Sequence, residues 1–155
     1  MHSPASSPTL PPDVRELLRA FTVHDVRYVV VGAHALGYWG QPRATGDFDL
    51  FVEPTPQNAA RILAALAEFG APLDDLKAED LATPGTVFQM GEPPWRIDLN
   101  TELTGITFEE AWSGHGVAHA AGLDIPVIAR EAMIRNKRAT GRPKDRLDLL
   151  LLGVD

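Results

Sequence analysis

A short apolar strand that ends in a glycine, followed after a loop by two aspartates one residue apart, limits the folds open to this chain. These features are Val30-Val31-Gly32-Ala33-His34 and Thr45-Gly46-Asp47-Phe48-Asp49. Side chains two residues apart on a strand point to the same face, so Asp47 and Asp49 are expected side by side. Two carboxylates this close repel each other unless a cation lies between them. The pattern therefore predicts a strand, a glycine turn, a helix and a second strand carrying a cation site.

The absence of cysteine narrows the ligands available to such a cation. Carboxylate oxygens without thiolates favour a hard ion, Mg²⁺ or Mn²⁺, which in proteins commonly shares its coordination sphere with substrate phosphates. The glycine turn that opens the helix offers backbone N–H groups to a phosphate. An Asp-x-Asp pair alone more often marks a solvated turn, but its combination with the glycine turn and the loop that carries Arg43 favours a metal and phosphate site.

The remaining hydrophobic pattern predicts one α+β domain over 13–155, preceded by a flexible Ser- and Pro-rich tail over 1–12. The expected helices cover 13–21, 33–39, 56–69, 108–112, 129–140 and 144–152. The expected strands cover 27–31, 47–52, 86–90, 95–100, 116–119 and 123–127, the middle two as a β-hairpin and the last two as a second, smaller pair. Segment 73–83 has no clear assignment. The predicted fold is a mixed β-sheet flanked by helices, with a helical C-terminus.

Composition and charge exclude several classes of protein. No run of apolar residues approaches the roughly 18 needed to span a membrane, and the N-terminal tail lacks the basic and apolar parts of a signal peptide. A cytoplasmic protein with no membrane partner is therefore expected. The net charge of −7 and the pI near 5.1 argue against a broad DNA-binding surface, although a local basic patch can still hold a nucleotide or an RNA end.

The glycine turn together with the Asp-x-Asp strand resembles the signature of polymerase-β-like nucleotidyltransferases, in which Gly-Gly or Gly-Ser precedes Asp-x-Asp or Asp-x-Glu. Ala33 departs from that signature: it keeps the backbone N–H but lacks a hydroxyl. The resemblance implies a third carboxylate on a later strand. Asp98, within Arg96-Ile97-Asp98-Leu99, fits that role, and the alternative is a hairpin residue bonded to backbone N–H groups.

Longer segments are similar to small bacterial proteins related to the AbiEii/AbiGii toxins and the MenT-like nucleotidyltransferases. These segments are 84–91, 94–98, 108–112 and 134–145. The similarity implies that Lys137 and Lys144 face a triphosphate, and that Asp145 or Asp148 orients a neighbouring basic group. Independently of that resemblance, the only dense basic cluster of this acidic chain lies at Lys137, Arg138, Arg142, Lys144 and Arg146, as polyphosphate binding requires.

The alternative for this cluster is a helix C-terminus complemented by cations, and for Arg138 and Arg146 the two interpretations weigh equally. The residues expected to contact the nucleotide are Gly32, Ala33, His34, Arg43, Thr45, Lys137 and Lys144. Arg43 contacts a phosphate or pairs with Asp47. His34 lines the pocket or is structural, as a single histidine on a short helix more often is.

The resemblance implies an enzyme, a magnesium- or manganese-dependent nucleotidyltransferase that moves an NMP from an NTP such as ATP to a hydroxyl acceptor. Asp47, Asp49 and Asp98 would bind the metal, and Asp98 would position or deprotonate the acceptor. The first possible acceptor is the 3′ end of tRNA. With this acceptor the protein would be a toxin that has an antitoxin protein as its partner. The alternatives are a small antibiotic, for which the chain is short of an acceptor domain unless it dimerises, and a catalytically silent nucleotide- or partner-binding domain.

Overall fold

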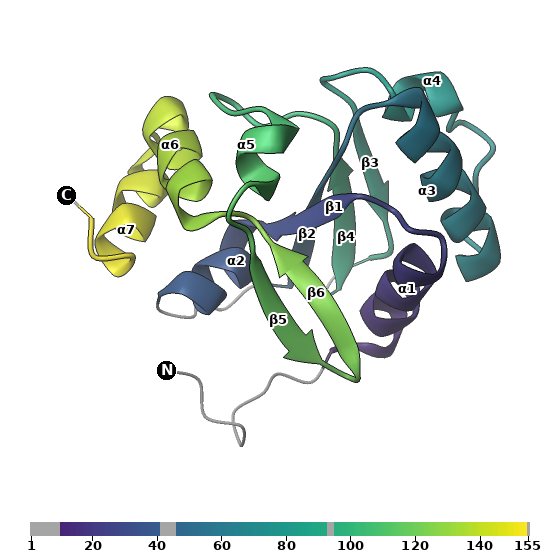
Figure 1. The fold of residues 1–155 in the computed structure, drawn as a ribbon, viewed down its shortest axis with the longest axis horizontal. Helices are drawn as coiled ribbons and strands as arrows, with labels where there is room; N and C mark the ends of the chain where they lie inside the picture. Colours follow the sequence, from purple (N-terminus) through teal and green to yellow (C-terminus); the bar gives the residue numbers. More distant parts are fainter. Residues whose placement is uncertain (1–9, 41–45, 93–94, 155) are drawn as a thin grey trace.

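The computed structural model describes residues 10–40, 46–92 and 95–154, which form six strands and seven helices (Figure 1). The helices are Pro12–Val23 (α1), Gly32–Trp39 (α2), Pro56–Phe69 (α3), Ala78–Leu81 (α4), Phe108–Trp112 (α5), Arg130–Thr140 (α6) and Pro143–Leu151 (α7). The strands are Tyr28–Val31 (β1), Asp47–Val52 (β2), Val87–Met90 (β3), Arg96–Asn100 (β4), Gly116–Ala120 (β5) and Leu123–Val127 (β6). Every expected element is present within two residues of its predicted bounds, and α4 lies in the segment left unassigned.

All six strands belong to one mixed sheet in the order β3-β4-β2-β1-β6-β5. The central strand β1 pairs antiparallel with β2 and parallel with β6, while β2 pairs parallel with β4. The expected hairpin of β3 and β4 is confirmed. The pair β5 and β6 is also present, but it extends this sheet instead of standing apart, because Val127 is buried beside Val30 and the Ile128 N–H donates to the Val30 carbonyl at 3.0 Å.

The two faces of the sheet differ in what they pack against. Along β2, Phe48, Leu50 and Val52 point to one face, where the neighbouring Tyr28 ring contacts Phe21 of α1 with ring centroids 5.3 Å apart. The other face carries Asp47, Asp49 and Phe51, and the Phe51 ring meets Phe108 of α5, also at 5.3 Å. The aspartates therefore lie on the face that α5 covers.

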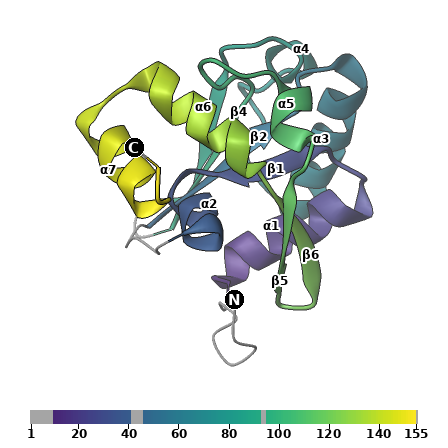
Figure 2. The same ribbon diagram turned by 60° about the vertical axis from the view of Figure 1, so that its left-hand side comes forward.

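Helices α6 and α7 pack against each other beside that same face, as Figure 2 shows. Gly141 allows the sharp turn between them, because its φ is +59°, a value that residues other than glycine rarely adopt. After it, Asp145 accepts a hydrogen bond from the Arg142 backbone N–H and so caps the start of α7. This corner holds the basic residues of the C-terminus close to the sheet.

The longest of the described helices, α3, has 14 residues, and none of them combines the length and the apolar character that crossing a membrane requires.

Candidate functional site

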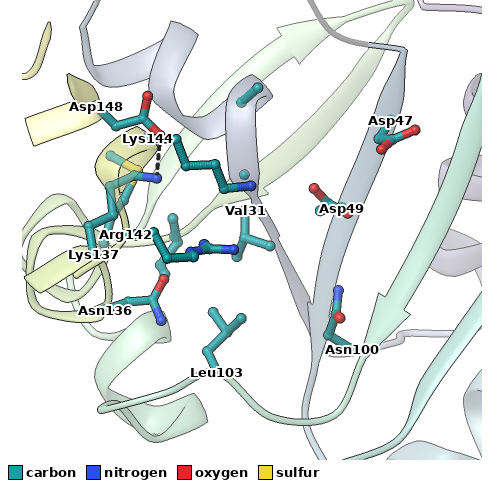
Figure 3. Close-up of a pocket in the computed structure, with 14 residues that line it drawn as sticks. Val31, Asp47, Asp49, Asn100, Leu103, Asn136, Lys137, Arg142, Lys144 and Asp148 are labelled. Atoms are coloured by element: carbon teal, nitrogen blue, oxygen red, sulfur yellow. Dashed lines mark hydrogen bonds and ion pairs between the residues drawn. The ribbon is translucent and has the colours of Figure 1, made fainter. Parts of the chain in front are cut away.

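A pocket of about 330 Å³ lies between the sheet and the α6–α7 corner (Figure 3). Its sheet side is formed by Val31, Gly32, Ala33, Asp47, Asp49 and Asn100. Its helical side carries Asn136, Lys137, Arg142, Lys144 and Asp148, with Leu103, Ile128 and Met133 between the two sides. Figure 3 shows Arg142 and Lys144 extending from the helical side toward Asp49. Acidic and basic side chains thus face each other across one cavity.

The acidic side is set by the register of two parallel strands. In the pairing of β2 with β4, Asp49 lies opposite Asp98, and Asp47 lies opposite Arg96. Asp98 is 8% exposed and lies beside Asp49 rather than in the pocket lining. The structure thus brings together the three carboxylates that the sequence singles out, two facing the pocket and one beside them.

Crowding changes the acidity of Asp49. Burial is the main cause that raises the pKa of Asp49 to about 6, followed by the charge of Asp98 and a hydrogen bond with it. The charge of Asp47 acts in the same direction, and the guanidinium of Arg96 acts against it. A group of carboxylates in which one resists ionisation is a place where an added cation is favourable.

Arg96 supplies part of that positive charge. Its Nε donates to Asp98 Oδ1 at 3.1 Å, and its Nη2 lies 3.3 Å from Asp98 Oδ2 and 3.1 Å from Asp47 Oδ2. The hydrogen bond to Asp98, followed by the negative charges of Asp98 and Asp47, raises the pKa of Arg96 further. Arg96 was not among the residues expected at the site, although its position two residues before Asp98 on the same strand was a usable signal.

The donor set fits a hard divalent cation. The groups are oxygen-only, they carry more negative charge than Arg96 balances, and they share one face of the sheet. Among residues 10–40, 46–92 and 95–154, however, no three acidic or histidine side chains lie close enough together to hold a metal ion. In this conformation Arg96 bridges Asp47 and Asp98. A metal held by Asp47, Asp49 and Asp98 would thus need these side chains to adjust.

On the helical side a buried lysine is held by two aspartates. Lys137 is 7% exposed, and its Nζ lies 2.8 Å from Asp148 Oδ2 and 3.9 Å from Asp145 Oδ1. Burial would raise the pKa of Asp145, but hydrogen bonds from Arg142 and Thr140 outweigh it and hold that pKa well below its usual range. Asp145 therefore stays ionised, and the two aspartates together fix the position of Lys137.

Arg142 is oriented by the same pair of helices. Its Nε and Nη2 donate to the two oxygens of Asp145 at 2.8 and 3.1 Å, which is the forked geometry that arginine makes with a carboxylate. Lys144 is exposed and makes no ion pair within the part of the chain that the structure describes. Asp145 thus orients the Arg142 guanidinium, and Asp148 holds the Lys137 ammonium.

Gly32 brings the backbone close to the acidic side. Its φ is +71°, and a Cβ built at this position would lie 2.5 Å from Asp49 Oδ2. Any side chain here would therefore displace Asp49 as well as strain the turn. Gly32 begins α2, and its neighbour Ala33 also lines the pocket, so the start of this helix borders the carboxylates.

His34, Arg43 and Thr45 are the other residues expected to bind a nucleotide. His34 is not among the pocket-lining residues: its ring stacks on Phe48, with centroids 4.2 Å apart, and burial lowers its pKa. The structure thus gives His34 a packing contact on the opposite face of β2. Arg43 and Thr45 lie outside the described residues.

Three further polar residues line the pocket without having been selected from the sequence. Asn100 follows Asp98 by two positions and so shares its strand face, a signal that strand alternation could have supplied. Arg142 belonged to the basic cluster but was not singled out. For Asn136, whose Nδ2 donates to the Thr104 carbonyl at 2.8 Å, the sequence holds no signal.

No family model matches the chain, and no curated protein does. Solved structures do match it. The protein TM1012 from Thermotoga maritima, described as a candidate nucleotidyltransferase, aligns over 96% of this chain and 96% of its own, with 14% sequence identity and a TM-score of 0.61. The lincosamide antibiotic adenylyltransferase LnuA, with lincomycin bound, aligns over 94% of this chain and 97% of its own, with 14% identity and a TM-score of 0.56.

These alignments span nearly the whole chain, so they concern the complete sheet and its helices and not one motif. The protein therefore has a nucleotidyltransferase fold, as the strand, glycine turn and Asp-x-Asp pattern predicted. Its architecture is a mixed six-stranded sheet with helices on both faces, which confirms the expected α+β class. A shared fold at this level of identity leaves the reaction to be argued from the site.

Proposed function

We propose that the chain is a nucleotidyltransferase that uses Mg²⁺ or Mn²⁺ and transfers an NMP from an NTP to a hydroxyl group. The observation that carries this proposal is the pocket in which Asp47 and Asp49, backed by Asp98, face Lys137 and Lys144. Carboxylates on one side can hold a divalent cation, and cations on the other can hold the phosphates that share it. Neither side alone would favour this chemistry over a solvated surface.

The protein's own residues would bind and orient the reactants. Lys137, Arg142 and Lys144 would bind the triphosphate from the helical side, with the backbone N–H groups at the start of α2 on the sheet side. Asp98 would position the acceptor hydroxyl and take its proton, as the acceptor oxygen bonds to the α-phosphorus and pyrophosphate departs. A bound divalent cation, held by Asp47, Asp49 and Asp98, would neutralise charge on the phosphate oxygens.

Two acceptor classes follow from the resemblance and from the comparisons. A relationship to the AbiEii/AbiGii and MenT-like proteins would give the 3′ end of tRNA as acceptor, a toxin role, an antitoxin partner and a cytoplasmic location. The likeness to LnuA favours a small hydroxylated antibiotic. The alignment covers 97% of LnuA, whose structure has lincomycin bound, and this supports a small acceptor for a chain of this extent.

The test is a transfer assay with each labelled NTP and Mg²⁺, offered total RNA, a panel of hydroxylated antibiotics, or the protein alone. We expect label on one acceptor class with the wild type and none with the double variant Asp47→Asn, Asp49→Asn. Asp124→Asn is the matched control, because that carboxylate is 79% exposed on the β5–β6 hairpin.

Undiminished transfer by the double variant would contradict the assignment of the site. A folded protein that binds Mg²⁺ and NTP but labels no acceptor, itself included, would instead support the catalytically silent alternative. Label on RNA alone would favour the toxin-like acceptor over the antibiotic, and label on an antibiotic alone would favour the reverse.

A further inference from the structure

Arg96 occupies the position between the carboxylates that a bound cation would take. Its guanidinium bridges two strands: it makes two hydrogen bonds to Asp98 on its own strand, at 3.1 and 3.3 Å, and one to Asp47 on β2, at 3.1 Å. Planar forked contacts of this kind are the strongest that a carboxylate makes with a side chain. The acidic side of the pocket therefore already contains a resident positive charge.

Strand geometry fixes this arrangement. Arg96 and Asp98 alternate on one face of β4, and the parallel register places them beside Asp47 and Asp49 of β2. No rotation of β2 against β4 is available to separate the charges, because both strands lie inside the sheet. Any change in the contacts of Arg96 must come from its side chain alone.

The side chain has room to move. The side chain of Arg96 is 34% exposed and that of Asp47 is 45% exposed, whereas the side chain of Asp98 is only 11% exposed. The guanidinium can thus leave toward solvent, where its charge is hydrated at little cost, whereas the Asp98 carboxylate cannot. Movement of the Arg96 guanidinium away from Asp98 is therefore favourable only when another cation takes its place beside that carboxylate.

We propose that Arg96 is the resident counter-cation of this site, and that a divalent ion binds by displacing its guanidinium from Asp98 and Asp47. This inference rests on the proposed function, since it concerns the same carboxylates. Arg96 is a positioning residue here: it balances the charge of the carboxylates and holds them in place in the metal-free protein, and it lowers the affinity for the metal by competing with it.

The test measures Mn²⁺ binding without nucleotide, by calorimetry and by the electron paramagnetic resonance signal of free Mn²⁺. Arg96→Gln removes the competing charge, so it is expected to bind Mn²⁺ about tenfold more tightly than the wild type. Arg96→Lys keeps the charge but cannot fork across two carboxylates, so its affinity should lie between the two.

Arg27→Gln is the matched control. It removes a guanidinium that also bridges two carboxylates, those of Glu53 and Glu109, and whose side chain is similarly exposed at 33%, but which does not line the pocket. Its Mn²⁺ affinity should stay within about twofold of the wild type if contact, and not the general field, is what matters. An equal gain in Arg27→Gln and Arg96→Gln would overturn the proposal.

Further outcomes separate this inference from the proposed function. Wild-type binding of Mn²⁺ that is not strengthened in Arg96→Gln or Arg96→Lys overturns the inference and leaves the function standing. An absence of Mn²⁺ binding in all four proteins overturns both. If Arg96→Gln does not fold without metal, Arg96→Lys decides, and an affinity no higher than that of the wild type counts against displacement.

Discussion

At Asp49 a carboxylate lies beside two others and is partly withdrawn from water. Its pKa is raised to about 6, mainly by burial and then by Asp98, so the folded protein keeps a proton that the unfolded chain releases at lower pH. Above an unfolded pKa near 4 the folded state binds more protons, and the stability that this proton contributes is lost as the pH rises through about 6. The ionised Asp49 carboxylate should therefore lower the stability of the metal-free protein at neutral pH.

Asp49→Asn is expected to remove that loss of stability. With a chelator present at about pH 7.5, the free energy of unfolding of the variant should be about 1–2 kcal/mol higher than that of the wild type, and at about pH 4.5 this difference should have shrunk by more than half. Urea unfolding at the two pH values measures the difference. Asp124→Asn on the β5–β6 hairpin is the control, and a gain for Asp49→Asn that did not depend on pH would contradict the raised pKa.

Lys137 and Lys144 line the same pocket but differ in what holds them. Lys137→Met would leave Asp148 charged and buried without its 2.8 Å partner, so a loss of about 3–5 kcal/mol of stability is expected. Lys144→Met concerns an exposed side chain, so it should change stability by less than about 0.5 kcal/mol.

Lys144 should affect the binding of a ligand without affecting folding. Lys144→Met should weaken the binding of Mg²⁺–ATP about tenfold while the protein stays fully folded, because a charge-assisted contact to phosphate is lost. Urea unfolding and calorimetric titration give the two quantities on the same samples. Arg138→Met, next to Lys137 but outside the pocket lining, is the control, and an equal loss of affinity there would argue against a specific role for Lys144.

At the scale of the elements, the turn from β1 into α2 depends on Gly32. Gly32→Ala is expected to cost about 2–4 kcal/mol, because its φ is +71° and the added Cβ would meet Asp49 Oδ2 at 2.5 Å. Gly70→Ala is the matched control: its φ is +90°, but nothing lies within 4 Å of the added atom. The control should therefore lose only about 1 kcal/mol of backbone strain.

Affinity for Mn²⁺ distinguishes the two glycines further. In Gly32→Ala the displaced Asp49 carboxylate should weaken Mn²⁺ binding, whereas Gly70→Ala should bind as the wild type does. Thermal unfolding and calorimetry measure both effects. Equal losses of stability in the two variants would mean that the close approach to Asp49 plays no part.

The elements themselves were predictable because each is encoded locally. The run of β-branched residues in β1, the Pro start and Gly end of α3, and the alternation of Asp47 and Asp49 are all short-range patterns. The register between β2 and β4 is not short-range, since the two strands are joined through α3, α4 and β3. This is why the contact of Arg96 with Asp47 was not foreseen, although Asp98 was.

The same limit explains two other differences. The place of β6 beside β1 depends on a parallel pairing between distant segments, so the sequence showed the β5–β6 hairpin but not its union with the main sheet. His34 was expected near the phosphate because it follows the glycine turn. Its ring points instead to the opposite face of β2, a direction set by the packing of α2 against Phe48.

At the scale of the whole molecule, the net charge of −7 contrasts with the cationic helical side of the pocket. A free triphosphate carries several negative charges, so the acidic protein should repel it unless a divalent cation accompanies it. Affinity for the nucleotide and affinity for the metal are therefore expected to be linked.

Mg²⁺–ATP at about one hundred times its dissociation constant should stabilise the folded protein by about 2.7 kcal/mol, a rise in melting temperature of about 5–10 °C. ATP with a chelator should give a much smaller rise, and so should Mg²⁺ alone. Differential scanning fluorimetry compares the three conditions. An equal shift from ATP with chelator would show that the metal is not needed to bring the nucleotide to the pocket.

The parallel pairing of β2 with β4 also bears on how such a chain can vary over evolution. The pairing is set by the two strands alone, so the segment that connects them can lengthen, shorten or be exchanged without moving Asp49 away from Asp98. One residue inserted within either strand would instead turn its aspartate to the opposite face of the sheet. Related proteins can therefore diverge widely between these strands while tolerating no length change within them.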